Sequence, residues 1–163
     1  MRVTLRPARE ADSAQLLAWR NDPDVRAASF AQREVSEPEH REWLRSKLAD
    51  TACRLLIVEE GGEPVGQVRL DRLPPDEAEV SIGLAATARG RGIGRVALEL
   101  AVGEAAAAFD VGAVSARVKE DNEPSLRAFA AAGFGEVRRA GGVVTLRRAA
   151  PQASSVGSSR RST

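Results

Sequence analysis

The chain has 163 residues, with 24 Lys and Arg against 23 Asp and Glu, so its net charge at neutral pH is +1. This length suits a single domain, and the balanced charge excludes the broad basic field of proteins that hold nucleic acid or anionic membranes. The single cysteine, Cys53, excludes an intrachain disulfide and a multi-cysteine zinc site. Without an apolar leader or a membrane-length apolar segment, we expect one cytoplasmic domain over residues 1–150, with no membrane, nucleic-acid or metal partner.

The first fifty residues are expected to form a strand and two helices. Alternation over residues 3–5 predicts the strand, and a cap at Asp12 or Ser13 begins a helix that Asp22-Pro23 ends. The segment Ser36-Glu37-Pro38-Glu39 has the pattern of a capping box with proline in the first turn, which predicts a second helix. The largely apolar side of that helix carries His40, Trp43, Leu44, Lys47 and Leu48.

The middle of the chain has the alternation of an antiparallel sheet. Residues 55–58 form a short apolar run, and the turn at 60–63 folds it back onto a second strand at 65–71. The next predicted strand, 77–84, alternates cleanly between its two faces. One face carries Ala78, Val80, Ile82 and Leu84, and the other carries Glu77, Glu79, Ser81 and Gly83.

The second half of the chain alternates helices with strands. The spacing predicts a helix from 93 to about 109, a strand over 111–118 and a helix that ends at a left-handed Gly133. A closing hairpin follows, with strands at 136–139 and 143–147. Residues 151–163 are rich in serine and poor in large apolar residues, which predicts a disordered tail.

A loop of arginine and glycine precedes the helix at 93, and residues 88–98 read A-R-G-R-G-I-G-R-V-A-L. Its glycines permit tight turns and close approach to a ligand, while the helix N-terminus offers unpaired N–H groups and a partial positive charge. This pattern predicts a phosphate-shaped anion site. Gly94-Arg95-Val96 stands where a P-loop needs Gly-Lys-Ser/Thr, and the glycine spacing differs from the dinucleotide fingerprint.

Two motifs together resemble the GCN5-related N-acetyltransferase (GNAT) superfamily. Arg89-x-x-Gly92-x-Gly94 resembles its acetyl-CoA pyrophosphate loop, and D-N-E-P-S-L-R-A-F-A-A-A-G-F at 121–134 is similar to the helix that closes its coenzyme site. The motifs stand in the family order, separated by one helix and one strand. The resemblance implies an α+β fold (α/β in some schemes) with a mixed central sheet of about 6–7 strands flanked by helices. It also implies acetyl-CoA as co-substrate, with no metal.

The same resemblance assigns the coenzyme contacts. It implies that the strand at 77–84 splays from its neighbour, so that backbone atoms of 82–84 bond the pantetheine arm, and that the amides of 89–94 hold the pyrophosphate. Asn122 would bond the pantetheine, or would simply cap its helix. The implied set is Ile82, Gly83, Leu84, Arg89, Gly90, Arg91, Gly92, Ile93, Gly94, Asn122, Ser125 and Phe129.

The predicted catalytic groups depart from the family pattern. Many members have a tyrosine at the position of Phe129, as the acid for the departing thiolate, but this chain has no tyrosine. Phe129 cannot donate a proton and is expected to pack against Phe134, so water would protonate the thiolate or it would leave unassisted. Glu79 is the predicted base, acting through a water more easily than directly, with an uninvolved surface carboxylate as the alternative. Cys53 is interpreted as structural.

The N-terminal third resembles two branches of the superfamily. L-L-A-W-R-N-D-P-D-V-R at 16–26, with E-H-R-E-W-L at 39–44, resembles acetyltransferases of nucleotide-linked amino sugars of the pseudaminic acid type, and related segments occur in ribosomal-protein N-acetyltransferases. In both branches this region covers the acceptor side. The candidate substrate-binding residues are therefore Trp19, Arg20, Asn21, Phe30, His40 and Trp43. Core packing of the tryptophans and His40, and a solvated helix end for Arg20, remain the alternatives.

The leading hypothesis is an enzyme that transfers acetyl from acetyl-CoA to the primary amine of a small molecule, favouring a nucleotide-linked amino sugar, by direct attack in a ternary complex. One alternative is a protein N-terminal acetyltransferase of the ribosomal-protein type. Another is a catalytically silent acetyl-CoA-binding module, which the missing tyrosine motivates. The sequence leaves open the acceptor and whether the chain is a monomer or a homodimer.

Overall fold

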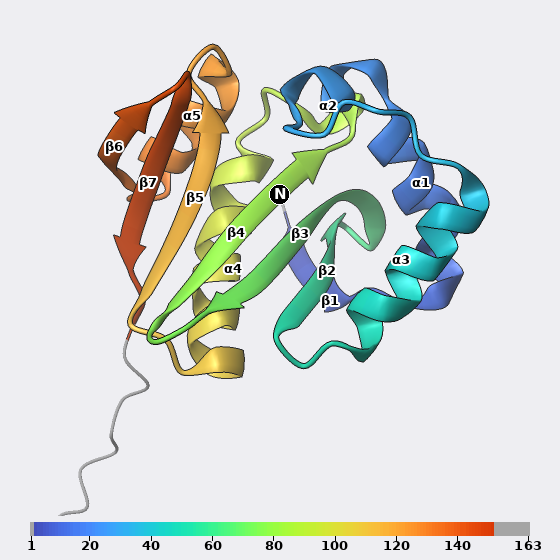
Figure 1. The fold of residues 1–163 in the computed structure, drawn as a ribbon, viewed down its shortest axis with the longest axis horizontal. Helices are drawn as coiled ribbons and strands as arrows, with labels where there is room; N and C mark the ends of the chain where they lie inside the picture. The colour runs from blue at the N-terminus through green and yellow to red at the C-terminus, as the bar shows by residue number, and fades with distance from the viewer. Residues whose placement is uncertain (1, 152–163) are drawn as a thin grey trace, which may run out of the picture.

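The computed structural model describes residues 2–151 and contains one seven-stranded sheet in the order β1-β2-β3-β4-β5-β7-β6 (Figure 1). Neighbouring strands are antiparallel except β4 and β5, which are parallel. The strands are β1 (Val3–Pro7), β2 (Cys53–Glu60), β3 (Glu63–Leu73), β4 (Glu77–Leu84), β5 (Ala113–Lys119), β6 (Gly135–Ala140) and β7 (Val143–Ala149). The mixed sheet confirms the predicted fold class. Except for Pro151, the predicted tail lies outside the described residues.

Helices cover the two faces of the sheet differently. The long helix α4 (Ile93–Phe109) and the shorter α5 (Glu123–Ala131) lie behind the sheet in Figure 1, while α1 (Ser13–Asn21) and α3 (Glu37–Ala49) lie beside β2. Leu56 and Val58 of β2 belong to the cluster with α4, whereas Leu55 and Ile57 belong to the cluster with α1 and α3. Because side chains alternate along a strand, α1 and α3 occupy the face opposite α4.

The front face of β3, β4, β5 and β7 has no helix over it (Figure 1). On β4, Ala78 and Val80 are buried toward α4, so Glu77, Glu79 and Ser81 point to this open face. The alternation predicted for 77–84 is therefore confirmed. None of the helices between residues 2 and 151 has the length and apolar character that crossing a membrane requires.

Most predicted elements are confirmed: β4 has the predicted bounds, and the ends of the other strands differ from the prediction by at most two residues. Helix α2 (Pro23–Ala28) was not predicted; it begins directly after the break at Asp22-Pro23. The Asp22 carboxylate accepts hydrogen bonds from the amides of Asp24 (2.9 Å) and Val25 (3.4 Å), and Pro23 occupies the first turn. Asp22 thus ends α1 and also caps α2. Because Asp-Pro is typical of a helix end, the same two residues were interpreted only as the end of α1.

Asn21 fixes the segment between α2 and α3 onto the end of α1. Its Nδ2 donates to the Val35 carbonyl at 2.8 Å, and its Oδ1 accepts from the Val35 amide at 2.9 Å. Both hydrogen bonds are partly buried. The residue that we proposed as a substrate contact therefore has a structural task that both ends of its amide perform.

We expect Asn21→Ala to lower the free energy of unfolding by about 1–3 kcal/mol, because it leaves both backbone groups of Val35 without these partners. The measurement is denaturant unfolding followed by circular dichroism. Gln32→Ala is the control, since the exposed Gln32 amide makes only a 3.4 Å contact with the Ala27 carbonyl and its loss should stay within about 0.5 kcal/mol. Equal effects of the two substitutions would contradict a structural role for Asn21.

Candidate functional site

Strands β4 and β5 separate after a short parallel contact. Their ladder contains three pairs, from Glu77 with Ala113 to Glu79 with Ser115, although β4 continues to Leu84 and β5 to Lys119. Beyond Glu79, β4 remains paired with β3, and β5 remains paired with β7. The sheet therefore opens between 80–84 and 116–119, which is the splay that the family resemblance implied. Backbone groups along these edges point into the opening, where a ligand or water can bond them.

The glycine loop lies at the open end of this separation. Gly90 and Gly92 adopt left-handed backbone angles, with φ of +73° and +77°, and Gly92 is the N-terminal cap of α4. A non-glycine residue adopts these angles with strain, so the two glycines explain the tight bend before the helix. Gly94 differs because it is helical and buried, and a Cβ built on it would lie 3.5 Å from Ala128 of α5. Both the backbone angle and the space at this position would accept a Cβ, since 3.5 Å is an ordinary van der Waals distance.

The arginine side chains of this loop are already paired with acids. Arg89 donates from Nε to the Leu84 carbonyl at 3.2 Å and from Nη1 to the Asp24 carboxylate at 3.2 Å, while Arg91 pairs with Glu60. These contacts hold the loop to β4, α2 and β2. The groups left to meet an anion are the backbone amides at the start of α4, where the helix dipole is positive. The contact of the pyrophosphate with the amides of 89–94 stays a prediction.

Helix α5 starts beside the same region and ends in the core. The Asn122 Oδ1 accepts from the Ser125 amide at 3.3 Å, so Asn122 caps its helix as the alternative expected. The cap uses only this oxygen and leaves the Nδ2 donors uninvolved. At the other end, Phe129 is 2% exposed and meets Phe134 edge-on at a ring distance of 5.0 Å. The expected packing of Phe129 against Phe134 is confirmed.

The predicted base, Glu79, is bound to an arginine that the sequence analysis did not single out. Arg117 of β5 donates from Nε to one Glu79 oxygen at 3.0 Å and from Nη2 to the other at 3.1 Å. The carboxylate holds the pKa of Arg117 above its ordinary value. Arg117 alternates with the buried Ala116 and Val118, so the strand pattern alone assigns it to the open face.

The acceptor-side candidates divide into buried and exposed residues. Trp19 and Trp43 pack against the cluster of Leu16, Leu44 and Ile57, and His40 is 4% exposed with its ring 5.5 Å from Trp43. Burial, and secondarily the charge of Arg20, lowers the pKa of His40. This environment favours the packing alternative for the three aromatic residues, and their contact with a substrate stays a prediction.

Two other candidates reach toward the opening of the sheet. Phe30 is 54% exposed, and the Arg117 guanidinium lies 5.4 Å from its ring centre. Arg20 donates from Nη2 to the Ala31 carbonyl at 2.7 Å. Its buried Nη1 has no hydrogen-bond partner among the described residues.

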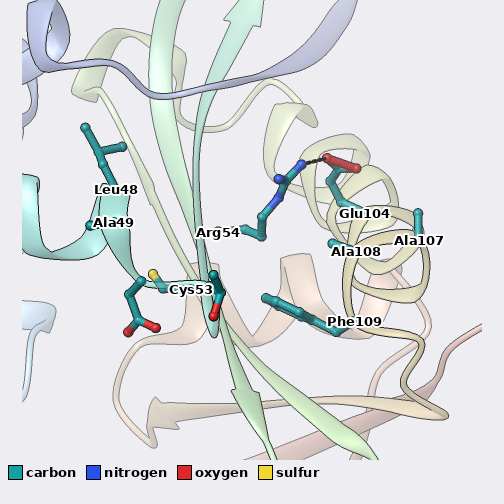
Figure 2. Close-up of a pocket in the computed structure, with 10 residues that line it drawn as sticks. Leu48, Ala49, Cys53, Arg54, Glu104, Ala107, Ala108 and Phe109 are labelled. Carbon is teal, nitrogen blue, oxygen red and sulfur yellow. Dashed lines mark hydrogen bonds and ion pairs between the residues drawn. The ribbon is translucent and has the colours of Figure 1, made fainter.

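A cleft of about 450 Å³ lies at the other end of α4 (Figure 2). It is lined by Cys53, Arg54, Glu104 and Phe109, with Arg54 and Glu104 joined at 3.1 Å. None of the residues of the glycine loop or the opening contributes to it, so it is separate from the candidate site. Burial raises the pKa of the Cys53 thiol to about 11, which agrees with its interpretation as structural.

Comparisons with known proteins agree with this geometry. The domain family described as "Acetyltransferase (GNAT) domain" matches residues 2–135. An N-acetyltransferase 9-like protein from Nematostella vectensis is 25% identical over 152 residues, covering 83% of this chain and 75% of that protein.

Solved structures share the whole fold. Spermidine N-acetyltransferase from Vibrio cholerae, in complex with CoA and spermine, matches with a TM-score of 0.82 at 20% identity, covering 91% of this chain and 95% of that one. Ribosomal-protein-alanine N-acetyltransferase from Brucella melitensis matches with a TM-score of 0.73 at 26% identity, covering 90% and 99%. The chain belongs to the GNAT acetyltransferase family and is an acetyl-CoA-dependent N-acetyltransferase.

Proposed function

We propose that the enzyme transfers acetyl directly from acetyl-CoA to the primary amine of a small molecule, with a nucleotide-linked amino sugar as the acceptor. The observation that carries the proposal is the bend through Gly90 and Gly92 at the mouth of the opening between β4 and β5. It supports a coenzyme whose pyrophosphate meets the first amides of α4 and whose pantetheine arm runs along the backbone of 82–84.

In the proposed reaction the acceptor nitrogen attacks the thioester carbon, the carbon–sulfur bond breaks and the thiolate leaves. Glu79 takes the proton of the amine through a water, because it lies where β4 and β5 last pair and points to the open face. The thiolate takes its proton from water, since Phe129 has no proton to give. Cys53 carries no acetyl group in this route, and its thiol, which is buried and has a raised pKa, supports direct transfer.

The acceptor assignment rests on the charges around the opening. Arg117 and Lys119 of β5 offer cationic donors, and the exposed Phe30 offers a ring on which a base or sugar can stack. A phosphate-bearing amino sugar complements this set better than a polycation does. A protein N-terminus is the second candidate acceptor, favoured by the 26% identity with the Brucella melitensis enzyme.

An acceptor panel tests this proposal. We expect release of free CoA thiol with an amino sugar nucleotide, and slower release with spermidine or an alanine-starting peptide. Fastest turnover with the peptide would instead support the N-terminal acetyltransferase. Tight acetyl-CoA binding without turnover on any amine would support a silent binding module.

Gly92→Ala should weaken acetyl-CoA binding about tenfold. No atom lies within 4 Å of a Cβ built on Gly92, so the substitution acts through the left-handed backbone, at about 1–2 kcal/mol, and displaces the amides. Gly141→Ala is the matched control, with φ of +60° and equally open surroundings in the β6–β7 turn. Calorimetry of acetyl-CoA binding should separate the two variants, although both lose similar stability. An equal loss of affinity in both would count against the loop.

Glu79→Gln should lower kcat roughly 100-fold or more, because the amide cannot accept the proton of the amine. The matched control is Glu77→Gln, since Glu77 lies on the same face and pairs with Arg147 at 3.0 Å. Steady-state rates with saturating acetyl-CoA and the best acceptor provide the comparison. Retention of full kcat in Glu79→Gln would remove Glu79 from the mechanism.

A further inference from the structure

We propose that Arg117 recognises a phosphate group of the acceptor, and that in doing so it exchanges the Glu79 carboxylate for that phosphate. This inference rests on the proposed function and adds a residue that selects among amines. Arg117 is the specificity-determining residue, and its exchange makes Glu79 available as the base only when a phosphate-bearing acceptor is in place.

The position of Arg117 is the first support. The last pair between β4 and β5 joins Glu79 to Ser115, so Arg117 is two residues beyond it, on the edge that has left β4. Its side chain is 56% exposed, whereas that of Glu79 is 19% exposed. The arginine can therefore turn toward a ligand in the opening while the carboxylate stays in place.

The second support is the way the two side chains engage each other. Both Glu79 oxygens accept hydrogen bonds from Arg117, at 3.0 and 3.1 Å, so the pairing is bidentate. Both oxygens of a carboxylate held in this way are occupied by charge-assisted hydrogen bonds, which compete with a hydrogen bond from a water that carries the amine proton. A phosphate presents the same oxygen geometry to a guanidinium group, so it can replace the carboxylate one for one.

Two other carboxylates, those of Asp71 and Glu77, lie next to Glu79 on the open face. Asp71 of β3 lies directly across from Glu79 in the ladder and is itself paired with Arg69 at 2.8 Å. On the same strand, Glu77 is paired with Arg147 of β7. Once Arg117 turns toward a phosphate, both Glu79 oxygens lose their guanidinium donors and can accept a hydrogen bond from the water that carries the amine proton, while Asp71 and Glu77 keep their own arginines.

The surroundings of Arg117 fit a phosphate ester. The Phe30 ring lies 5.4 Å from its guanidinium carbon, and Lys119, the next residue on this face of β5, donates from Nζ to the Ala27 carbonyl at 2.9 Å. Two cations and an exposed ring thus meet between β5 and the segment that follows α2. A ring of this kind can cover the sugar or base to which the phosphate is attached.

Arg147 provides a matched comparison within the molecule. It pairs with Glu77 at 3.0 Å on the same open face and is 55% exposed. However, it pairs in register with Ser115, at the closed end of the sheet, where β4 and β5 are still joined. The same chemistry away from the opening should play no part in acceptor recognition.

A binding experiment tests recognition independently of turnover. The protein is first saturated with CoA to fill the glycine loop and is then titrated calorimetrically with inorganic pyrophosphate. We expect Arg117→Gln to weaken pyrophosphate binding at least tenfold, Arg117→Lys to give an intermediate affinity and Arg147→Gln to match the wild type. Absence of pyrophosphate binding by the wild type, or equal binding by Arg117→Gln, overturns the proposal.

A kinetic experiment tests the exchange, using an amino sugar nucleotide and the same amino sugar without its nucleotide. Arg117→Gln should raise KM for the nucleotide-linked acceptor about 10–100-fold, while kcat/KM for the free sugar should rise, because Glu79 is then already released. A similar fall for both acceptors would show a merely structural role and overturn the inference. Absence of transfer to any amine by the wild type would instead refute the proposed function.

Discussion

The separation of β4 from β5 is the constraint on which the rest of the site depends. Two parallel strands normally continue their ladder, but here it stops at Glu79 and Ser115 while both strands continue outward. Backbone groups on the facing edges then need partners other than each other. Antiparallel pairing with β3 and β7 holds the two strands in place, so the opening is maintained by the outer parts of the sheet. The start of α4 and the α2 segment converge on it through Arg89.

Ion pairs are frequent on the open face, but they add little to the free energy of unfolding. Exposed pairs such as Arg147 with Glu77 contribute little to folding, because water screens the charges and two long side chains lose freedom. The buried cluster behind the sheet, with Val68, Leu70 and Val114 fully buried, supplies the stability instead. The charged face is thus free to serve recognition, and each of its arginines can change partner at low energetic cost.

Local patterns made most of the fold predictable. Period-two alternation defined β4, the capping box at Ser36 defined α3, and the glycine spacing identified a loop whose Gly90 and Gly92 have left-handed angles. The partner of Glu79 was not predictable, because Arg117 is 38 residues away and meets it only through the short parallel contact. Nor could helical spacing show that His40 is buried, since that depends on how α3 packs against α1.

Phe129 is a core residue at the position where many family members have a tyrosine, so its packing bears on the proposed reaction. Its ring is nearly fully buried against Phe134, so the end of α5 where a hydroxyl acid would act is closed by apolar packing. In the proposed reaction the thiolate receives no proton from that ring, and water that reaches the opening between β4 and β5 is the proton source. Under this proposal the opening has two tasks, holding the pantetheine arm and admitting the water that completes transfer. An acceptor that fills the mouth and engages Arg117 limits that water to the moment when the amine is in position, which favours acetyl transfer over hydrolysis of the thioester.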